Sequence, residues 1–386
     1  KSATNEGMAR GGMPSRALLE HHRAIAAGGV GMTTLAYCAI SADGRTFEDQ
    51  VRLDESSIAP LRAITDAIHR EGAAVCAQIT HGGAFNFLRR LSTSRPLSAS
   101  GGLNAPGIIS GRLFKTAMQP DDLERVGSEF VDAARIAQRA GFDAVEIHMG
   151  HGYLLSQFLS PRYNHRRDDY GGDAQARARF PREVLTRVLD AVGAQLAVTA
   201  KLSTVEGFDG GAQIEDGEVV ARELSRAGAQ LLVLSAGMNV ESPWTIFGSR
   251  VARAAGEHAP TWAMRATNPL LRLQEPDIEF RELYLLESSR RIRAAVSTPL
   301  AYLGGVTSAA GVQTVMDAGF DAVALGRALI HQADFVNALR TGQERSGCTA
   351  CNRCVGMMYT PGGTRCVLTG IDRPELNRQP AHLATP

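Results

Sequence analysis

The sequence lacks long apolar runs and an excess of charge of either sign. No stretch of 18 or more apolar residues occurs, and the first residues, KSATNEGMARGGMPSR, have no apolar signal core, so nothing predicts a membrane span or secretion. With 41 basic against 40 acidic residues the net charge is +1, without the basic excess that nucleic acid or an anionic membrane would favour. We therefore expect a cytoplasmic protein that acts on a small molecule, with no nucleic-acid or membrane partner.

A G-x-G-x-x-G turn after an early strand is also missing, which argues against a doubly wound sheet that binds a dinucleotide. What is present is an alternation of short β-rich apolar runs with longer helical patterns, which predicts a parallel sheet with crossover helices. The seven runs cover residues 30–40, 73–79, 142–148, 196–202, 229–236, 298–305 and 321–326.

Seven strands at this spacing are one short of a TIM (β/α)8 barrel. We predict an α/β barrel over residues 1–340, with its first strand upstream of Lys1, and a cysteine-rich C-terminal extension over residues 341–386. Residues 86–118 and 238–280 have no clear period, and long connections of this kind are often functional lids.

Polar residues follow several of the predicted strands, where a barrel has its active site. Gly304 and Gly305 close one run, and Gly326 and Arg327 close the next, just before a helix. Bare backbone N–H groups, a helix start and a guanidinium at one place indicate a phosphate site. Two tight turns with a surface arginine are the alternative.

One long segment resembles a known family. GFDAVEIHMGHGYLLSQFLSPRYNHRRDDYGG, followed by ARARF, is similar to the signature of the old yellow enzyme family of FMN-dependent NAD(P)H:flavin oxidoreductases. The similarity continues through AQITHGG, AKLS, YLGGV and ALGRALI to the C-terminal region, which resembles the branch of 2,4-dienoyl-CoA reductase and trimethylamine dehydrogenase. The resemblance implies a barrel that binds FMN and is reduced by NAD(P)H.

The resemblance also implies the cofactor-binding residues. Gln78 matches an amide at the flavin pyrimidine edge, and Lys201 matches a cation beside N1 and O2, which stabilises the anionic reduced flavin. Tyr37 stands at a flavin-contact position where relatives more often have a small residue. The full implied set is Ala3, Thr4, Asn5, Tyr37, Gln78, Lys201, Gly304, Gly305, Gly326 and Arg327.

The resemblance assigns catalysis to His148, His151 and Tyr153. The histidines match two donors to the carbonyl oxygen of an activated alkene, which stabilise the enolate as hydride reaches Cβ. Tyr153 matches the proton donor to Cα. A metal site and a packed histidine pair are the alternatives. The pair lacks the glutamate of an H-E-x-x-H zinc motif.

Cys348, Cys351, Cys354 and Cys366 form C-x2-C-x2-C-x11-C. Four thiols so close in a cytosolic chain indicate a metal or iron–sulfur site. The resemblance implies a [4Fe-4S] cluster, although the related branch has three residues in the second gap. Structural zinc, or no metal, is the alternative.

We therefore predict an ene-reductase that passes hydride from reduced FMN to an α,β-unsaturated carbonyl compound or thioester. The alternatives are a flavin dehydrogenase or demethylase acting on an amine or saturated ring, and an electron-transfer subunit. A cluster would need electrons from a separate donor protein or be structural. The oligomeric state is open, with a homo-oligomer among the alternatives.

Overall fold

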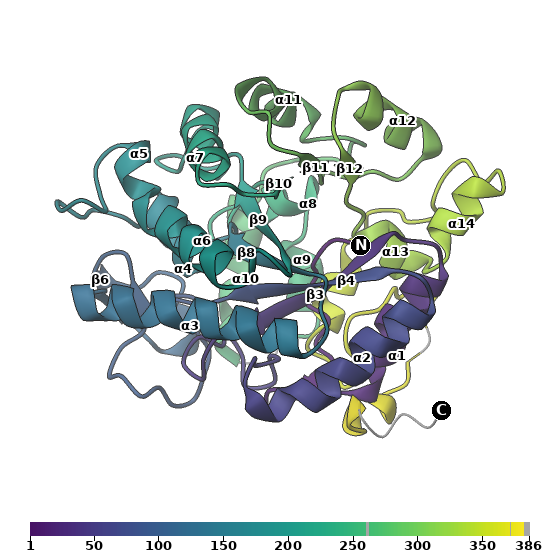
Figure 1. The fold of residues 1–386 in the computed structure, drawn as a ribbon, viewed down its shortest axis with the longest axis horizontal. Coiled ribbons are helices and arrows are strands. Elements are labelled where there is room, and N and C mark those ends of the chain that lie inside the picture. Colours follow the sequence, from purple (N-terminus) through teal and green to yellow (C-terminus); the bar gives the residue numbers. More distant parts are fainter. Residues whose placement is uncertain (260–261, 371, 382–386) are drawn as a thin grey trace.

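The computed structural model describes residues 1–259, 262–370 and 372–381. Its central sheet contains seven parallel strands in chain order, and all seven predicted runs form these strands. They are β3 (Met32–Ala39), β4 (Ala74–Thr80), β8 (Ala144–Met149), β9 (Ala197–Ser203), β10 (Leu231–Ser235), β11 (Leu300–Tyr302) and β12 (Ala322–Val323). Figure 1 shows the strands in the middle of the molecule with helices around them. The predicted α/β barrel class is confirmed.

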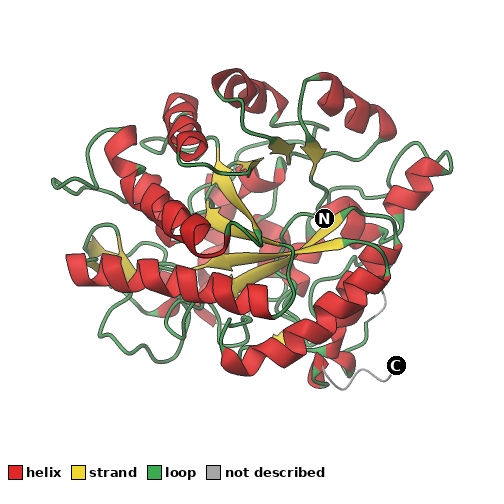
Figure 2. Ribbon diagram, in the orientation of Figure 1, coloured by secondary structure: helices red, strands yellow, loops and turns green. Residues whose placement is uncertain are grey.

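The crossover helices bury one apolar stripe each against this sheet. In α3 (Pro120–Arg139) the buried stripe includes Leu123, Val126 and Phe130, at the three- and four-residue steps of a helix. The chain leaves α3 through Gly141 at φ +84°, a conformation that favours glycine. The other crossover helices include α1 (Arg16–Ala27), α2 (Ile58–Arg70), α6 (Arg179–Val192), α7 (Ile214–Arg226), α11 (Leu286–Ala295) and α12 (Ala309–Asp317) (Figure 2).

Shorter elements lie at the ends of the barrel and in its connections. They are β1 (Ala9–Arg10), β2 (Met13–Pro14), η1 (Glu55–Ser57), α4 (Leu154–Leu159), α5 (Ala174–Arg177), α13 (Arg327–His331) and α14 (Phe335–Arg340). Among the described residues, no helix has both the length and the apolar character that a membrane crossing requires.

The first residues of the chain lie between the two edge strands of the sheet. The Lys1 amino group donates to Met32 O at 2.7 Å, and Thr34 N donates to Lys1 O at 3.1 Å, both on β3. On the other side, Ser2 N donates to Leu325 O, just after β12, at 2.8 Å. Residues 1 and 2 therefore stand where the first strand of an eight-stranded barrel belongs.

The two long connections are more ordered than their sequences indicate. Residues 86–118 contain β5 (Leu97–Ser98), β6 (Gly102–Leu103), β7 (Phe114–Ala117) and η2 (Ile108–Ser110). Residues 238–280 contain α8 (Pro243–Phe247), α9 (Ala252–Gly256) and α10 (Trp262–Gln274), while residues 260–261 of this connection lie outside the described residues. Long-range contacts stabilise these elements: Glu275 accepts the N–H of Ala252 at 2.9 Å and so caps α9 from a distant position.

The cysteine-rich extension packs against the beginning of the chain. It contains α15 (Arg353–Met357) and η3 (Leu376–Arg378), and residues 371 and 382–386 of the predicted extension lie outside the described residues. Thr364 N donates to Glu6 O at 2.7 Å, and Thr364 Oγ1 donates to Asn5 O at 2.6 Å. Two segments more than 350 residues apart in the sequence thus share one side of the barrel.

Candidate active site

A buried polar triad crosses three neighbouring strands. Gln78 on β4 donates through Nε2 to Glu146 Oε1 on β8 at 2.7 Å, and Lys201 Nζ on β9 lies 3.0 Å from the same oxygen. The side chains of Lys201 and Glu146 are only 1% and 4% exposed. The structure thus brings two predicted cofactor residues together through Glu146, which the sequence analysis missed. The available signal was a carboxylate inside an apolar run.

His148, at the end of β8, is a neutral imidazole with a defined tautomer. Its Nδ1 accepts the N–H of Gly150 at 3.2 Å, which assigns the ring proton to Nε2. Burial lowers the pKa of His148 well below its ordinary value, and His151 and Lys201 lower it further. His148 can therefore donate one hydrogen bond through Nε2 without carrying charge.

His151 approaches His148 from the turn after β8. Its φ of +61° is rare for a residue other than glycine, and its ring centroid lies 5.0 Å from that of His148. Nε2 of His151 lies 2.8 Å from Ser235 Oγ at the end of β10. Burial, together with Lys201, lowers the pKa of His151 to about 3. Both predicted histidines are therefore neutral near pH 7.

Tyr153 completes the predicted trio at the start of α4. Its ring centroid is 4.7 Å from that of His148 and 5.1 Å from that of Tyr37. Burial raises the pKa of Tyr153 to about 12, and the adjacent polar side chains of Tyr37 and Asn239 offset part of that rise. The phenol therefore keeps its proton at neutral pH, as a general acid must. Asn239 is a further polar neighbour that the sequence analysis did not find.

At the predicted phosphate site, the backbone is closely covered by side chains at Gly305 and uncovered at Gly326. Gly305 has φ +76°, and a Cβ there would lie 2.8 Å from the ring of Tyr284 and 2.9 Å from that of Phe280. A Cβ on Gly326 would meet nothing within 4 Å. The Arg327 guanidinium lies 5.1 Å from the centroid of Phe280, so Phe280 touches both halves of the predicted site.

Arg327 itself is turned toward two other segments. It donates to Phe247 O at 2.7 Å, in α8, and to Asn352 Oδ1 at 2.5 Å, between two of the predicted metal-ligating cysteines. The structure therefore connects the predicted phosphate site with the extension through one side chain.

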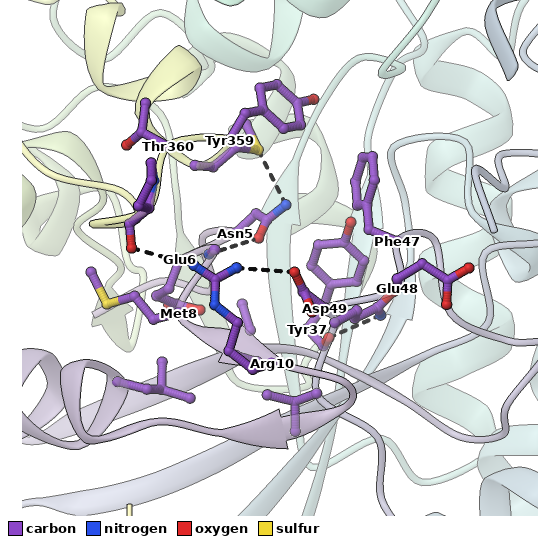
Figure 3. Close-up of a pocket in the computed structure, with 18 residues that line it drawn as sticks. Asn5, Glu6, Met8, Arg10, Tyr37, Phe47, Glu48, Asp49, Tyr359 and Thr360 are labelled. Carbon is purple, nitrogen blue, oxygen red and sulfur yellow. Dashed lines mark hydrogen bonds and ion pairs between the residues drawn. The ribbon is translucent and has the colours of Figure 1, made fainter. Parts of the chain in front are cut away.

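The remaining predicted cofactor residues lie beside a cavity of about 280 Å³. Asn5 and Tyr37 line it, together with Phe47 and Tyr359, and Asn5 Nδ2 lies 3.1 Å from the sulfur of Met358 (Figure 3). Two further predicted residues lie close by: Ala3 packs against the pair formed by Tyr37 and Tyr153, and Thr4 donates to Glu6 Oε1 at 3.4 Å.

The four cysteines of the extension line a second, much smaller cavity of about 20 Å³. Cys348, Cys351, Cys354 and Cys366 are all free thiols, and Arg327 lies in the same wall. In the part of the chain that the structure describes, however, no three or more His, Cys, Asp or Glu side chains are arranged to hold a metal ion. The four thiols therefore line one cavity but are not arranged as a complete set of metal ligands.

The donors at the strand ends fit a flavin better than a metal. Gln78 and Lys201 lie on β4 and β9, on either side of β8. The amide of Gln78 can both donate and accept, and the ammonium of Lys201 is a cation, so both suit the pyrimidine edge of a flavin. Two neutral imidazoles and a phenol lie nearby, at the end of β8 and the start of α4. Polar groups at the carboxyl ends of the strands are the arrangement of a barrel enzyme.

The chain belongs to the NADH:flavin oxidoreductase / NADH oxidase family, whose family model matches residues 3–259. It is 36% identical, over 379 residues, to 4,4'-dithiodibutanoate disulfide reductase of Rhodococcus erythropolis, with 95% of this chain and 90% of that protein covered. The predicted resemblance is thus confirmed: the protein is an oxidoreductase of the old yellow enzyme family, which supports FMN and NAD(P)H as its cofactors.

Solved structures support the same fold. A 2-naphthoyl-CoA reductase in complex with 2-naphthoyl-CoA has a TM-score of 0.79 at 20% identity, over 99% of this chain and 55% of that one. The old yellow enzyme homologue of Zymomonas mobilis has a TM-score of 0.69 at 22% identity, over 90% and 89%. The chain also spans less than half the length of three further curated relatives.

Proposed function

We propose that the protein reduces the C=C bond of an α,β-unsaturated ketone or thioester, with FMN as cofactor and NAD(P)H as reductant. The observation that carries this proposal is the neutral pair His148 and His151 beside a protonated Tyr153, with ring centroids 5.0 and 4.7 Å from His148. Two neutral donors and one weak acid suit a reaction in which charge develops on a carbonyl oxygen and a carbon takes up a proton.

Separate groups of residues hold the cofactor in this proposal. Gln78 and Lys201 bind the pyrimidine edge, and Glu146 keeps the Lys201 ammonium in place. Backbone N–H groups at Gly304, Gly305 and Gly326, with the Arg327 guanidinium, bind the phosphate. Asn5 and Tyr37, which line the cavity of about 280 Å³, and the neighbouring Ala3 and Thr4 lie beside the cofactor. When bound, FMN supplies the hydride that the substrate β-carbon accepts.

The chain contributes orientation and proton transfer. His148 donates to the substrate oxygen through Nε2–H. His151 donates through Nδ1–H, while its Nε2 accepts the hydroxyl of Ser235, and together they stabilise the enolate that forms. Tyr153 then donates its phenolic proton to Cα, because its pKa of about 12 keeps it protonated until the enolate is present. Neutral imidazoles can donate these hydrogen bonds while Tyr153 remains the source of the proton.

Disulfide reduction is a second candidate function. The relative of Rhodococcus erythropolis, which aligns over 95% of this chain, is named for a disulfide substrate. A disulfide that accepts hydride at one sulfur becomes a thiol there and releases a thiolate from the other sulfur, which takes a proton from solvent. One hydride and one proton then give two thiols.

We also propose that Cys348, Cys351, Cys354 and Cys366 hold a [4Fe-4S] cluster. Their convergence on one cavity supports this proposal, while their open arrangement leaves structural zinc, or no metal, as the competing outcomes. Iron and zinc analysis of protein purified without oxygen distinguishes the three. No step of the reaction above depends on a cluster.

The decisive variant for the function is Tyr153→Phe. With a cyclic enone or an enoyl thioester, we expect formation of the saturated product to fall by about 100-fold, within the usual range for loss of a general acid. Reduction of bound FMN by NAD(P)H should stay within about twofold of wild type, because that step needs no proton from Tyr153. Stopped-flow absorbance and product analysis measure the two steps separately.

Tyr170→Phe is the control, because its phenol contacts Glu183 at 3.3 Å and takes no part in the proposed site. A preparation without FMN would overturn the proposal as a whole. Unchanged alkene reduction by Tyr153→Phe would overturn the role of Tyr153, and activity with a disulfide alone would favour the second candidate.

A further inference from the structure

Tyr37 lies between Tyr153 and the cavity of about 280 Å³. The two phenol rings are 5.1 Å apart and belong to one small buried cluster with Ala36. Tyr37 also lines the cavity, whose wall on this side is formed by Tyr37 and not by Tyr153. Figure 3 shows Tyr37 and Phe47 on one side of this cavity, next to Asn5. Tyr37 is therefore in contact both with the proposed acid and with a space large enough for several waters.

Tyr153 must recover a proton after each turnover, and most of its surroundings cannot supply one. Only 6% of its surface is exposed. Among the described residues around it, Phe85 is apolar and Asn239 has no acidic proton. His148 is deprotonated at neutral pH, because burial holds its pKa far below 6.5. Among the described residues around Tyr153, Tyr37 is the phenol in ring contact with it, and Tyr359, which besides burial also contributes to the raised pKa of Tyr153, is the competing donor.

We propose that Tyr37 is a proton relay that reloads Tyr153 from water in the cavity of about 280 Å³. This inference rests on the proposed role of Tyr153 as the acid. Tyr37 acts through Tyr153 and does not itself touch the substrate.

The proton balance of the relay is simple. Tyr153 gives its phenolic proton to Cα of the substrate and becomes a phenolate. The Tyr37 O–H bond breaks as its proton moves to the Tyr153 oxygen, and a cavity water gives a proton to Tyr37. The hydroxide left in the cavity is neutralised from bulk solvent, so one solvent proton is consumed for each product. No electrons move in these steps.

The two transfers must occur together. Burial raises the pKa of Tyr37 well above its usual value, so a Tyr37 phenolate would be costly at this position. A relay that takes up a proton as it gives one avoids that charge. The coupling requires water at Tyr37 at the moment of transfer, and the cavity of about 280 Å³ has room for it.

The cavity has a route to solvent and a fixed wall at Tyr37. Arg10 and Asp49 form an ion pair at its edge, with side chains 45% and 50% exposed, so this edge reaches bulk water (Figure 3). Gln50 also lines the cavity, and its Nε2 donates to the backbone oxygen of Tyr37 at 3.0 Å. The backbone of the proposed relay residue is therefore held in place.

Tyr37→Phe tests the relay, because it removes the hydroxyl and keeps the ring. In rapid-quench experiments with FMN-loaded protein and a cyclic enone, with rates expressed per bound flavin, we expect a first turnover that is faster than the later ones, because Tyr153 starts protonated. Later turnovers should slow by at least about tenfold, which gives a burst of one product per flavin. The slow phase should also show a larger solvent isotope effect than wild type.

Tyr359→Phe is the matched control. Tyr359 lines the same cavity, and its ring lies 5.8 Å from that of Phe47. Its hydroxyl is the competing donor, because besides burial Tyr359 also contributes to the raised pKa of Tyr153. A relay through Tyr37 predicts that Tyr359→Phe shows no burst. A purely structural role of Tyr37 would slow the first turnover as well.

The double variant Tyr37→Phe/Tyr153→Phe provides a second test. If Tyr37 acts only through Tyr153, the double variant should lose no more activity than Tyr153→Phe alone. A further loss, or steady-state rates in Tyr37→Phe equal to wild type, would overturn the relay while leaving the proposed function intact. If Tyr153→Phe itself is fully active, the proposed role of Tyr153 and the relay both fail.

Discussion

Among single residues, Glu146 and Lys201 form a buried ion pair in the candidate site. Their side chains are 4% and 1% exposed, and their charged atoms are 3.0 Å apart. Two charges removed from water gain stability only when they are paired and hydrogen-bonded, and Gln78 supplies a further hydrogen bond to the carboxylate. Loss of one partner leaves an unpaired buried charge on the other.

Glu146→Gln should therefore destabilise the protein by about 3 kcal/mol, the usual cost of breaking a buried pair from one side. The substitution keeps the size of the side chain and removes its charge. Unfolding in urea, followed by circular dichroism on the FMN-free protein, measures the change. Glu183→Gln is the control: its carboxylate is 35% exposed, and it pairs with Arg179 at 3.7 Å, so we expect a loss below about 1 kcal/mol. Equal losses in the two variants would contradict this account.

The residues of the trio could be predicted from the sequence, and their partners could not. His148, His151 and Tyr153 lie within six positions, so one strand end and one turn are enough to bring them together. Asn239 lies in the connection after β10, and its approach to Tyr153 depends on how strands far apart in the sequence are ordered. The sequence marks Glu146 as unusual but does not indicate its pairing with Lys201.

At the scale of elements, the strands were predictable because parallel strands are buried on both faces and appear as continuous apolar runs. In β4, for example, every residue except Ala74 is buried. The connections were not predictable for the opposite reason. Elements such as α9 are short, and their stability comes from distant groups such as Glu275, which leaves no local period.

The glycine turn after β11 gives a prediction at this scale. Gly305→Ala should lower the retention of FMN and destabilise the protein by more than about 1 kcal/mol, because a Cβ would lie 2.8 Å from Tyr284 at a φ of +76°. Gly319→Ala is the matched control, since Gly319 has a φ of +81° and nothing within 4 Å of a Cβ. Thermal melting and flavin absorbance after gel filtration measure both effects.

Both variants strain the backbone in the same way, because both glycines have a positive φ. The difference in stability and FMN retention between them therefore measures the effect of the clash between a Cβ at position 305 and Tyr284. If both variants keep wild-type amounts of FMN, the turn after β11 is not part of the phosphate site.

At the scale of the whole molecule, the candidate site depends on segments from both ends of the chain. Residues 1 and 2 bridge the edge strands of the sheet, and the extension contributes Tyr359 to the cavity beside Tyr37. Arg327 ties the predicted phosphate site to the cysteine-lined cavity through Asn352. The barrel class could be predicted from the alternation of strands and helices in the sequence. The contacts that join the two ends of the chain at the site could be found only in the three-dimensional structure.

The most direct test of the central claim is the position of isotope in the product of one turnover. With NAD(P)H deuterated at C4 in ordinary water, reduction of an enone should place deuterium at Cβ and ordinary hydrogen at Cα. In deuterated water with ordinary NAD(P)H, deuterium should appear at Cα and ordinary hydrogen at Cβ. In both cases Tyr153→Phe should form the product about 100-fold more slowly. Deuterium from NAD(P)H at Cα, or no saturated product from protein that contains FMN, would contradict the account.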